Sequence, residues 1–305
     1  MYLRWTHDPD DGRLAVLFEA LELQGVTLTA SCIVDNQPGL PAVSLPSHVV
    51  STVVGDNSSR EFSGYEAGMQ HLRASGLKPD LWLLVNDRFE ADRLRFLCSE
   101  LLTTAYEASA VVGQVDRWPI PTRVMGRDVT TWVRSNLFII PGVLLQPGVS
   151  VVTIGIPEFE QLAPPPMLAT NPGSDLSGLD RLGASTWVEL VLEWLTGSGE
   201  FGLRAHWYLA GPIHDGNRQR VLGKIHSILN EQLLSADLRA RGAALLPFEL
   251  ASAIGALPGR TVRRAVVASI RRWPVRTVAL GSRRGVMAAL RVVAEVESKF
   301  RTWSR

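Results

Sequence analysis

Residues 80–88 read Asp80-Leu81-Trp82-Leu83-Leu84-Val85-Asn86-Asp87-Arg88. The stretch from Asp80 to Val85 has an apolar run without helical period, which predicts a strand buried on both faces. Such strands are typical of parallel sheets that helices cover on both sides. The polar residues that follow therefore stand where a sheet of this kind binds its ligands.

The flanking sequence alternates between strand and helix patterns. Further strands are expected at 2–5, 26–34, 49–54 and 110–115, and helices at 12–23, around 65–76 and at 91–106. Residues 130–140 lead with apolar and aromatic side chains into a turn at Pro141 and Gly142. Strand and helix in alternation predict an α/β fold with a mostly parallel, Rossmann-like sheet and a helical C-terminal extension.

After Pro157 the alternation of strand and helix patterns ends. Proline-rich and glycine-rich segments at 163–166 and 171–174 precede helical periodicity at 185–195 and 221–238. We expect three parts: an α/β ligand-binding domain at 1–160, a helical segment on the acceptor side at 161–255 and a basic amphipathic tail at 256–305.

Composition excludes several classes of protein. The chain has 305 residues, 46% of them hydrophobic, and a net charge of +1, which argues against a disordered tail and against a surface built to hold nucleic acid. The polar N-terminus does not resemble a signal peptide, and the longest uncharged stretch is broken by proline and glycine. We expect a cytoplasmic location.

The sequence lacks common phosphate-binding and catalytic motifs where they would be expected. It contains no G-x-G-x-x-G after its first predicted strand, and no G-x-x-x-x-G-K-[ST], no G-x-S-x-G and no H-E-x-x-H anywhere. Dinucleotide-dependent enzymes, P-loop NTPases, esterases and zinc proteases are therefore disfavoured.

Three pairs of acid and amide residues each follow an apolar run. The pairs are Asp35-Asn36, Asp56-Asn57 and Asn86-Asp87. Because parallel strands end at the same edge of a sheet, we expect these side chains to gather there. A carboxylate at that edge can bind ribose hydroxyls or a divalent cation that bridges a diphosphate. The alternative is that Asp and Asn only cap the helices that follow.

This pattern resembles the nucleotide-sugar-dependent glycosyltransferases of the GT-A fold, family 2 type. The segments that carry the resemblance are Ile33-Val34-Asp35-Asn36, Asp56-Asn57 through Gly64-Tyr65-Glu66-Ala67-Gly68, and Leu83 through Phe89, where the family has its D-x-D metal motif. They cover roughly the first 140 residues. The resemblance implies a glycosyltransferase that moves a sugar from a nucleotide-sugar donor to a growing glycan, in bacterial cell-surface polysaccharide synthesis.

The resemblance and the local sequence together assign candidate residues to the donor. The donor-binding set is Asp35, Asn36, Asp56, Asn57, Arg60, Tyr65, Asn86 and Arg88. Asp87 would act in catalysis and hold a divalent cation, Mg or Mn. Arg88 occupies the place of the second acid of the motif, so a guanidinium group could neutralise the diphosphate without a metal.

Other residues are candidates for the acceptor side and for the base. Trp132, Arg134 and His206 are the acceptor-side set, with packing in the core as the alternative for the tryptophan and the histidine. Glu61 and Glu66 at a predicted helix start are the leading candidates for the base, and Glu158, Asp180 and His206 are further ones. A catalytically weak nucleotide- or glycan-binding partner in a polysaccharide assembly complex is the alternative to an enzyme.

The C-terminal part is strongly basic. Residues 256–305 contain 12 Lys and Arg and 2 Glu. Between Thr261 and Trp273 apolar residues share one helical face and arginines the other, a pattern typical of helices on anionic membranes. The acceptor could then be a lipid-linked glycan, with the protein peripheral at the inner face of the membrane. The alternative is a helix that packs on the sheet domain, with solvated arginines. No motif indicates nucleic-acid binding.

Overall fold

The computed structural model describes residues 1–4, 12–36, 49–162, 185–197, 199–203, 209–214, 216–272, 287, 291 and 293. Its main element is a seven-stranded sheet with the order β3-β2-β1-β4-β8-β5-β9. The strands are β1 (Tyr2–Arg4), β2 (Ser31–Asp35), β3 (Val49–Val54), β4 (Leu81–Asn86), β5 (Ala110–Arg117), β8 (Thr131–Pro141) and β9 (Ala244–Pro247). A two-stranded ribbon, β6 (Arg123–Val124) and β7 (Arg127–Asp128), stands apart from it.

The sheet is mixed but mostly parallel, as the alternation of patterns predicts. β8 runs antiparallel to both of its neighbours, β4 and β5, while the other described pairings are parallel. The sheet also extends past the boundary expected near residue 160, because β9 pairs with β5.

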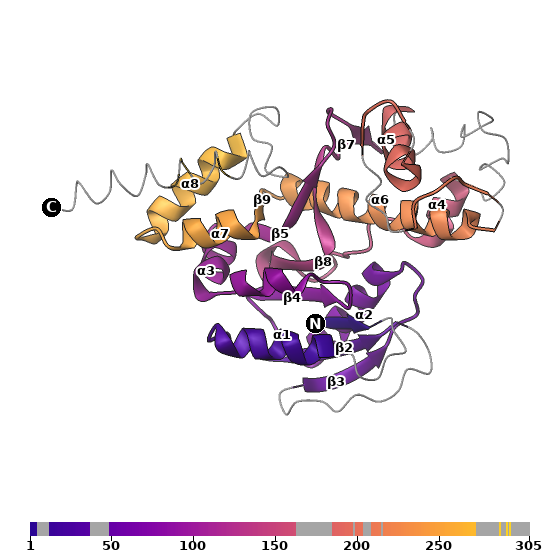
Figure 1. The fold of residues 1–305 in the computed structure, drawn as a ribbon. Helices are drawn as coiled ribbons and strands as arrows, with labels where there is room; N and C mark the ends of the chain where they lie inside the picture. The colour runs from indigo at the N-terminus through magenta and orange to yellow at the C-terminus, as the bar shows by residue number, and fades with distance from the viewer. Residues whose placement is uncertain are drawn as a thin grey trace.

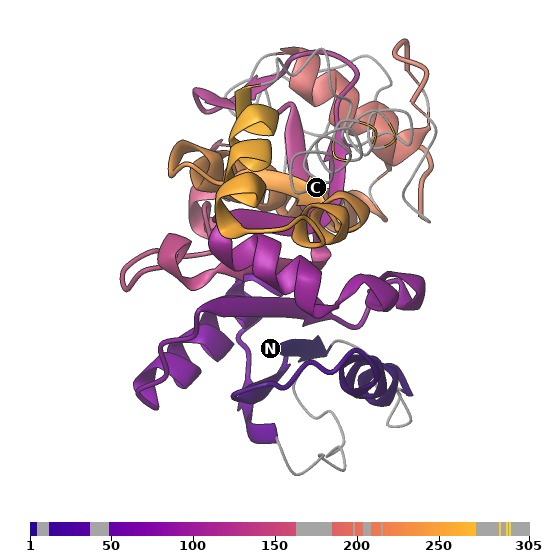
Figure 2. The same cartoon turned by 90° about the vertical axis from the view of Figure 1, so that its left-hand side faces the viewer.

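Helices cover both faces of the sheet (Figures 1 and 2). The helices are α1 (Gly12–Leu23), α2 (Glu61–Ala74), η1 (Ala91–Phe96), α3 (Ser99–Glu107), η2 (Gly142–Leu144), α4 (Ile156–Leu162), α5 (Ser185–Thr196), α6 (Arg218–Ala240), α7 (Phe248–Gly255) and α8 (Arg260–Arg272). One core cluster joins α1, α3, α7 and α8 to the sheet, and another joins α2 and the end of α6 to the opposite face.

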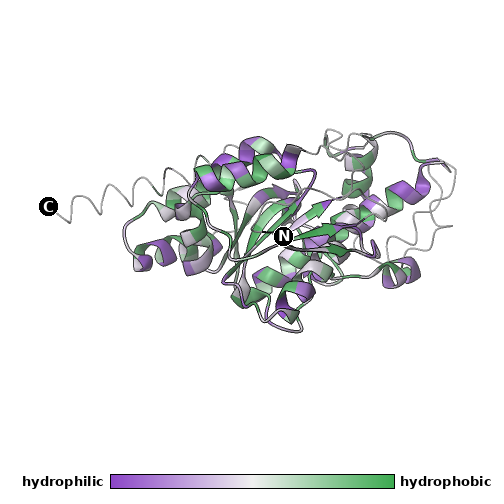
Figure 3. Ribbon diagram, turned by 90° about the horizontal axis from the view of Figure 1, so that it is seen from below, coloured by the Kyte–Doolittle hydropathy of each residue, from purple (hydrophilic) through white to green (hydrophobic). Residues whose placement is uncertain are grey.

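Neighbouring strand residues divide between these two clusters. In β2, Ile33 packs with the α1 side and Val34 with the α2 side, and in β4 Val85 and Leu84 divide in the same way. Successive side chains of a strand point to opposite faces, so a run buried on both faces must be apolar throughout. Figure 3 shows the resulting hydrophobic sheet between helices that carry their polar residues outside.

A third core cluster lies beyond the sheet. It joins α4 and α5 to the first half of α6 and contains Trp118, Trp132 and Trp187. The Trp187 indole Nε1 donates to Gln232 Oε1 at 2.7 Å, which ties α5 to α6. In Figure 1 this part lies at the opposite end of the molecule from α7 and α8. Helix α6 therefore connects the sheet to the additional cluster.

The C-terminal helix α8 packs on the sheet domain. Val266, Val267 and Ile270 are buried in the cluster that contains α3 and α7. The apolar stripe that could lie on a membrane is thus the face by which α8 joins the core. Among the described helices, none is both long and apolar enough to cross a bilayer.

Candidate functional site

A cavity of about 650 Å³ lies where α2, the end of β4, β8 and α6 meet. Its charged lining consists of Arg60, Arg88, Arg134, Arg220 and Lys224 with Glu61, Glu90, Asp116 and Glu231. Its aromatic lining consists of Trp118, Trp132 and Trp194. The cavity therefore combines cations, carboxylates and indole rings, which are the groups that bind phosphates, hydroxyls and flat rings.

Six of the predicted site residues line this cavity. They are Arg60, Glu61, Asn86, Arg88, Trp132 and Arg134. They come from segments far apart in the chain, so the fold brings predicted donor-side and acceptor-side residues to one place. His206 lies outside the described residues, as does Asp180.

Arg60 is held in an unusual backbone conformation at the start of α2. It has φ 55° and ψ −133°, a region that non-glycine residues rarely occupy. Its guanidinium group lies against α6, where a Cβ on Gly223 would come within 1.7 Å of Arg60 Nη2. The missing side chain at Gly223 therefore leaves the space that this guanidinium group uses.

The polar residues at the end of β2 and before α2 make hydrogen bonds within the protein, next to the cavity. The carboxylate of Asp35 accepts two hydrogen bonds from Arg4, each 2.7 Å long, and Arg4 is only 2% exposed. Asn36 is completely buried and donates from Nδ2 to Asn57 Oδ1 at 3.2 Å and to the Arg60 carbonyl at 2.9 Å. Asp35 thus binds β1, and Asn36 binds the backbone of Arg60, so neither residue is part of the cavity lining.

Asp56 and Tyr65 also have partners within the protein. The Asp56 carboxylate accepts from the Ser58 backbone N–H at 2.9 Å, which lowers the pKa of Asp56. The Tyr65 hydroxyl is buried and donates to the Ser135 carbonyl at 2.7 Å, and burial raises the pKa of Tyr65 well above its ordinary value. Tyr65 thus fixes β8 where it passes the cavity.

Glu66 binds a different part of the chain. Its Oε2 accepts from the Val151 backbone N–H at 2.9 Å and from the Ser150 hydroxyl at 3.0 Å. Its Oε1 accepts from Gln70 at 3.1 Å. Glu66 therefore anchors the segment before α4, and Glu61 is the candidate base that lines the cavity. Glu158, the other described candidate, lies at the start of α4 and is exposed.

Asp87 does not lie where the metal motif of the resembled family would place it. It is 2% exposed and is not among the described lining residues of the cavity, whereas its neighbours Asn86 and Arg88 are. Asn86 Oδ1 accepts from the Arg88 backbone N–H at 2.9 Å, which closes a tight turn after β4. The turn directs the carboxylate of Asp87 into the protein and the guanidinium group of Arg88 toward the cavity.

The described residues at this edge contain no preformed site for a divalent cation. Magnesium and manganese prefer several oxygen ligands. Within the described ranges, no group of three or more His, Cys, Asp or Glu side chains is arranged to hold a metal ion. The cavity offers guanidinium and ammonium groups instead.

Two carboxyl groups meet at Ser135 inside the cavity. Ser135 Oγ lies 2.7 Å from Glu231 Oε1 and 3.0 Å from Glu61 Oε1. The Ser135 backbone N–H donates to Glu231 Oε1 at 2.9 Å, and the Ser227 hydroxyl donates to Glu61 Oε2 at 3.3 Å. Burial raises the pKa of Glu231, and the Glu61 carboxylate adds to this effect.

Tryptophan rings form the apolar part of the cavity wall. The ring centroids of Trp118 and Trp132 are 4.8 Å apart, and Lys224 Nζ lies 5.7 Å from the centroid of Trp194. Trp118 Nε1 is buried and has no hydrogen-bond partner in the part of the chain that the structure describes. A polar ligand in the cavity could accept from this donor.

Several residues of the site escaped the sequence patterns. Glu231, Ser227, Lys224 and Arg220 lie on α6, which is buried on nearly all sides along its C-terminal half. In a sheet of this kind, ligand-binding residues are expected after the strands, and polar residues in the middle of a buried helix such as α6 do not fit that expectation. The available signal was the polar triplet Asn230-Glu231-Gln232 between Leu229 and Leu233, because buried polar residues need specific partners.

Comparison with protein families, curated proteins and solved structures found no match for this chain.

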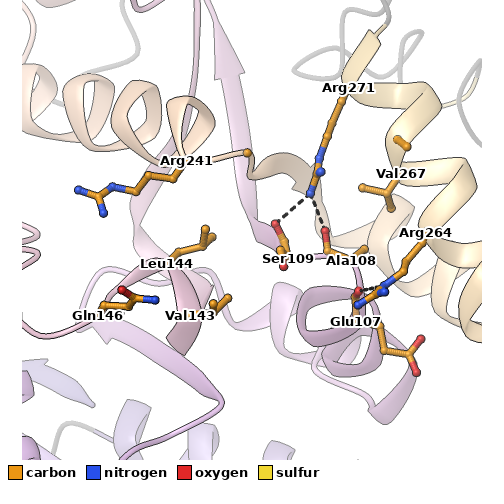
Figure 4. Close-up of a pocket in the computed structure, with 12 residues that line it drawn as sticks. Glu107, Ala108, Ser109, Val143, Leu144, Gln146, Arg241, Arg264, Val267 and Arg271 are labelled. Atoms are coloured by element: carbon orange, nitrogen blue, oxygen red, sulfur yellow. Dashed lines mark hydrogen bonds between the residues drawn. The ribbon is translucent and has the colours of Figure 1, made fainter.

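A second cavity, of about 610 Å³, lies between α8 and the end of α3 (Figure 4). Arg264 Nε donates to the Glu107 carbonyl at 2.7 Å, and Arg271 Nη2 donates to the Ala108 carbonyl at 2.7 Å. These arginines bind the last carbonyls of α3, which is the favourable place for cations on a helix. Two of the arginines that line this cavity are therefore engaged in joining α8 to α3.

The first cavity is the better candidate for chemistry. Arg60, Arg88 and Lys224 can receive an anion, the indole rings can stack on a base or a sugar, and Glu61 can accept a proton. Its position beyond the carboxyl ends of β1 and β4, the point where the strand order reverses, is the usual ligand site of such sheets.

Proposed function

We propose that this protein is a nucleotide-sugar-dependent glycosyltransferase of the GT-A fold, family 2 type. It transfers a sugar to a growing glycan or a lipid-linked glycan in bacterial cell-surface polysaccharide synthesis. The observation that carries the proposal is the gathering of Arg60, Arg88 and Lys224 with Glu61 and tryptophan rings in one cavity at the carboxyl edge of the sheet. The three segments that resemble this family lead to that same edge.

The diphosphate of the donor binds to the cations of the cavity. Arg60 and Arg88 flank the strand ends, and Lys224 faces them from α6. A guanidinium group can bind two phosphate oxygens at once and stabilises the charge that develops on a departing diphosphate. This assignment routes no step through a metal ion, in keeping with the residues present.

The acceptor binds on the side of β8 and α5. Trp194 offers a ring face for a sugar, Trp132 contributes to the wall from the core, and Arg134 is positioned by an ion pair with Asp116. The acceptor hydroxyl would then approach the donor next to Glu61. We place the protein at the inner face of the membrane, to which the net positive charge of residues 256–305 would attract it.

A nucleotide- or glycan-binding partner without turnover is the second candidate. It is favoured by the burial of Asp87, because the acid expected at the metal motif does not reach the cavity.

Ligand binding and turnover distinguish the two candidates. A thermal-shift panel of UDP, GDP, dTDP and CMP, with and without Mn²⁺, identifies the nucleotide, and hydrolysis of the matching nucleotide sugars measures turnover. The glycosyltransferase predicts a stabilising nucleotide and slow hydrolysis of its sugar conjugate. Stabilisation without hydrolysis or transfer supports the binding partner, and no stabilisation by any nucleotide contradicts the glycosyltransferase.

A further inference from the structure

A single serine hydroxyl stands between two carboxyl groups. Ser135 Oγ is within hydrogen-bond distance of Glu61 Oε1 and Glu231 Oε1, at 3.0 Å and 2.7 Å. A hydroxyl group has one hydrogen and can donate it to one carboxylate. The second contact becomes a hydrogen bond when the other carboxyl group carries a proton and donates it to Oγ.

The two carboxyl groups have unequal surroundings. Glu231 is 9% exposed, in the middle of α6, whereas Glu61 is partly exposed in the first turn of α2. Burial favours the neutral form of an acid, and a negative neighbour favours it further. Both effects favour a proton on Glu231.

Other charged groups surround the pair. They are Lys224 on α6, Arg134 on β8, Arg60 before α2, and Tyr65, Asp87 and His226. The cations limit the burial effect on Glu231, but burial is the largest influence on its pKa, which is raised.

We propose that Glu61, Ser135 and Glu231 hold one shared proton, and that the Glu61 carboxylate is the base that deprotonates the acceptor hydroxyl. The second half of this proposal rests on the proposed function. Glu61 is then a catalytic residue. Glu231 and Ser135 are positioning residues, because they act by orienting the carboxylate of Glu61.

The transfer step is a direct displacement. The proton of the acceptor hydroxyl moves to Glu61, and the acceptor oxygen forms a bond to the anomeric carbon of the donor. The bond from that carbon to the diphosphate oxygen breaks, and its electron pair leaves with the diphosphate, whose charge Arg60 and Arg88 stabilise. Glu61 later releases its proton to water.

Two glutamine variants separate the roles of the carboxyl groups. Glu61→Gln removes the base and is expected to lower transfer by roughly 10²- to 10⁴-fold, with nucleotide binding little changed. Glu231→Gln resembles the protonated acid in shape and hydrogen bonding, so it should lose less transfer than Glu61→Gln loses. It should also abolish the change in activity that ionisation of Glu231 causes at higher pH. Glu231→Leu, which cannot bind Ser135, should lose at least about tenfold.

Infrared spectroscopy tests the shared proton without any substrate. At a pH between the ordinary glutamate pKa and the raised pKa of Glu231, the wild type should show the C=O stretching band of a protonated carboxyl group. The band should vanish in Glu231→Gln and remain in Glu189→Gln, a change at an exposed glutamate of α5. Circular dichroism and thermal unfolding of each variant establish that it is folded.

The outcomes distinguish this inference from the proposed function. A wild type that transfers sugar while Glu61→Gln is fully active, or while Glu231→Gln is as inactive as Glu61→Gln, overturns the inference alone. A missing infrared band in the wild type also overturns it. A wild type without turnover on any donor contradicts the proposed function, and the infrared band then decides the shared proton by itself.

Discussion

Two cavities formed by the described residues have similar volumes, about 650 and 610 Å³, and several arginines line each of them. At the first cavity, cations at the start of α2, after β4, on β8 and on α6 lie together with carboxylates and indole rings. At the second cavity, Arg264 and Arg271 donate to carbonyls at the end of α3. The comparison teaches that the number of cations does not identify a ligand site. The first cavity differs from the second in that carboxylates and indole rings line it beside the cations, whereas Arg264 and Arg271 at the second cavity join two helices.

The largest difference between variants of the two cavities is expected in their affinity for a nucleoside diphosphate. Arg60→Ala and Arg88→Ala should each weaken the binding of a nucleoside diphosphate by roughly 10- to 100-fold, since each removes charge-assisted hydrogen bonds. Isothermal titration calorimetry measures the affinity. Arg241→Ala, which changes the lining of the second cavity, is the control and should bind as the wild type does. An equal loss in Arg241→Ala would make the second cavity the nucleotide site.

The arginines near the second cavity should affect stability instead. Arg263 donates from Nε to the Glu107 carboxylate at 2.7 Å and from Nη1 to the Leu257 carbonyl at 2.7 Å, in a mostly buried setting. Arg263→Ala should lower the free energy of unfolding by about 1–3 kcal/mol, because it leaves these acceptors without their partner. Urea denaturation measures this change. Arg260→Ala, at an exposed position of the same helix, should have little effect. A large loss of nucleotide affinity in Arg263→Ala would argue against the division between the two cavities.

A glycine substitution tests the position of Arg60 without removing its charge. A methyl group at Gly223 would occupy the space of the Arg60 guanidinium group. Gly223→Ala should therefore weaken nucleoside diphosphate binding about three- to tenfold, less than Arg60→Ala, while alanine favours the helix by about 1 kcal/mol. The double variant should bind no more weakly than Arg60→Ala alone, since both changes act on one group. Additive losses would show that Gly223 acts through something else.

The smallest expected difference between variants of the two cavities is in how the free energy of unfolding depends on pH. The pKa of Glu231 is raised in the folded protein, so the folded chain keeps this proton at a pH at which the unfolded chain has released it. The free energy of unfolding should consequently fall as the pH rises from the ordinary glutamate pKa through the raised one. Glu231→Gln should remove this decline, whereas Arg271→Ala, beside the second cavity, should leave it in place. Urea midpoints measured across the pH range test both, and an unchanged decline in Glu231→Gln would contradict the assignment.

Local patterns predicted much of the sheet. The apolar runs at Ile33-Val34 and at Leu84-Val85 mark strands buried on both faces, because each side chain must be apolar when helices cover both sides. The apolar stripe of α8 likewise predicted that one face of this helix is removed from water. It did not decide between a membrane and the core, since both would accept Val267 and Ile270.

The sequence by itself determined the strands, their polar ends and the shared edge at which these ends meet, because strand and turn preferences depend on neighbouring residues. Only the tertiary structure decided that Arg88 lines the cavity while Asp87 is buried, since one turn sends adjacent side chains in opposite directions. It also decided that Glu231 meets Glu61, as the two are brought together by packing of α6 against α2 and β8. Contacts between residues so distant in the chain depend on how whole elements pack, and no local pattern encodes that.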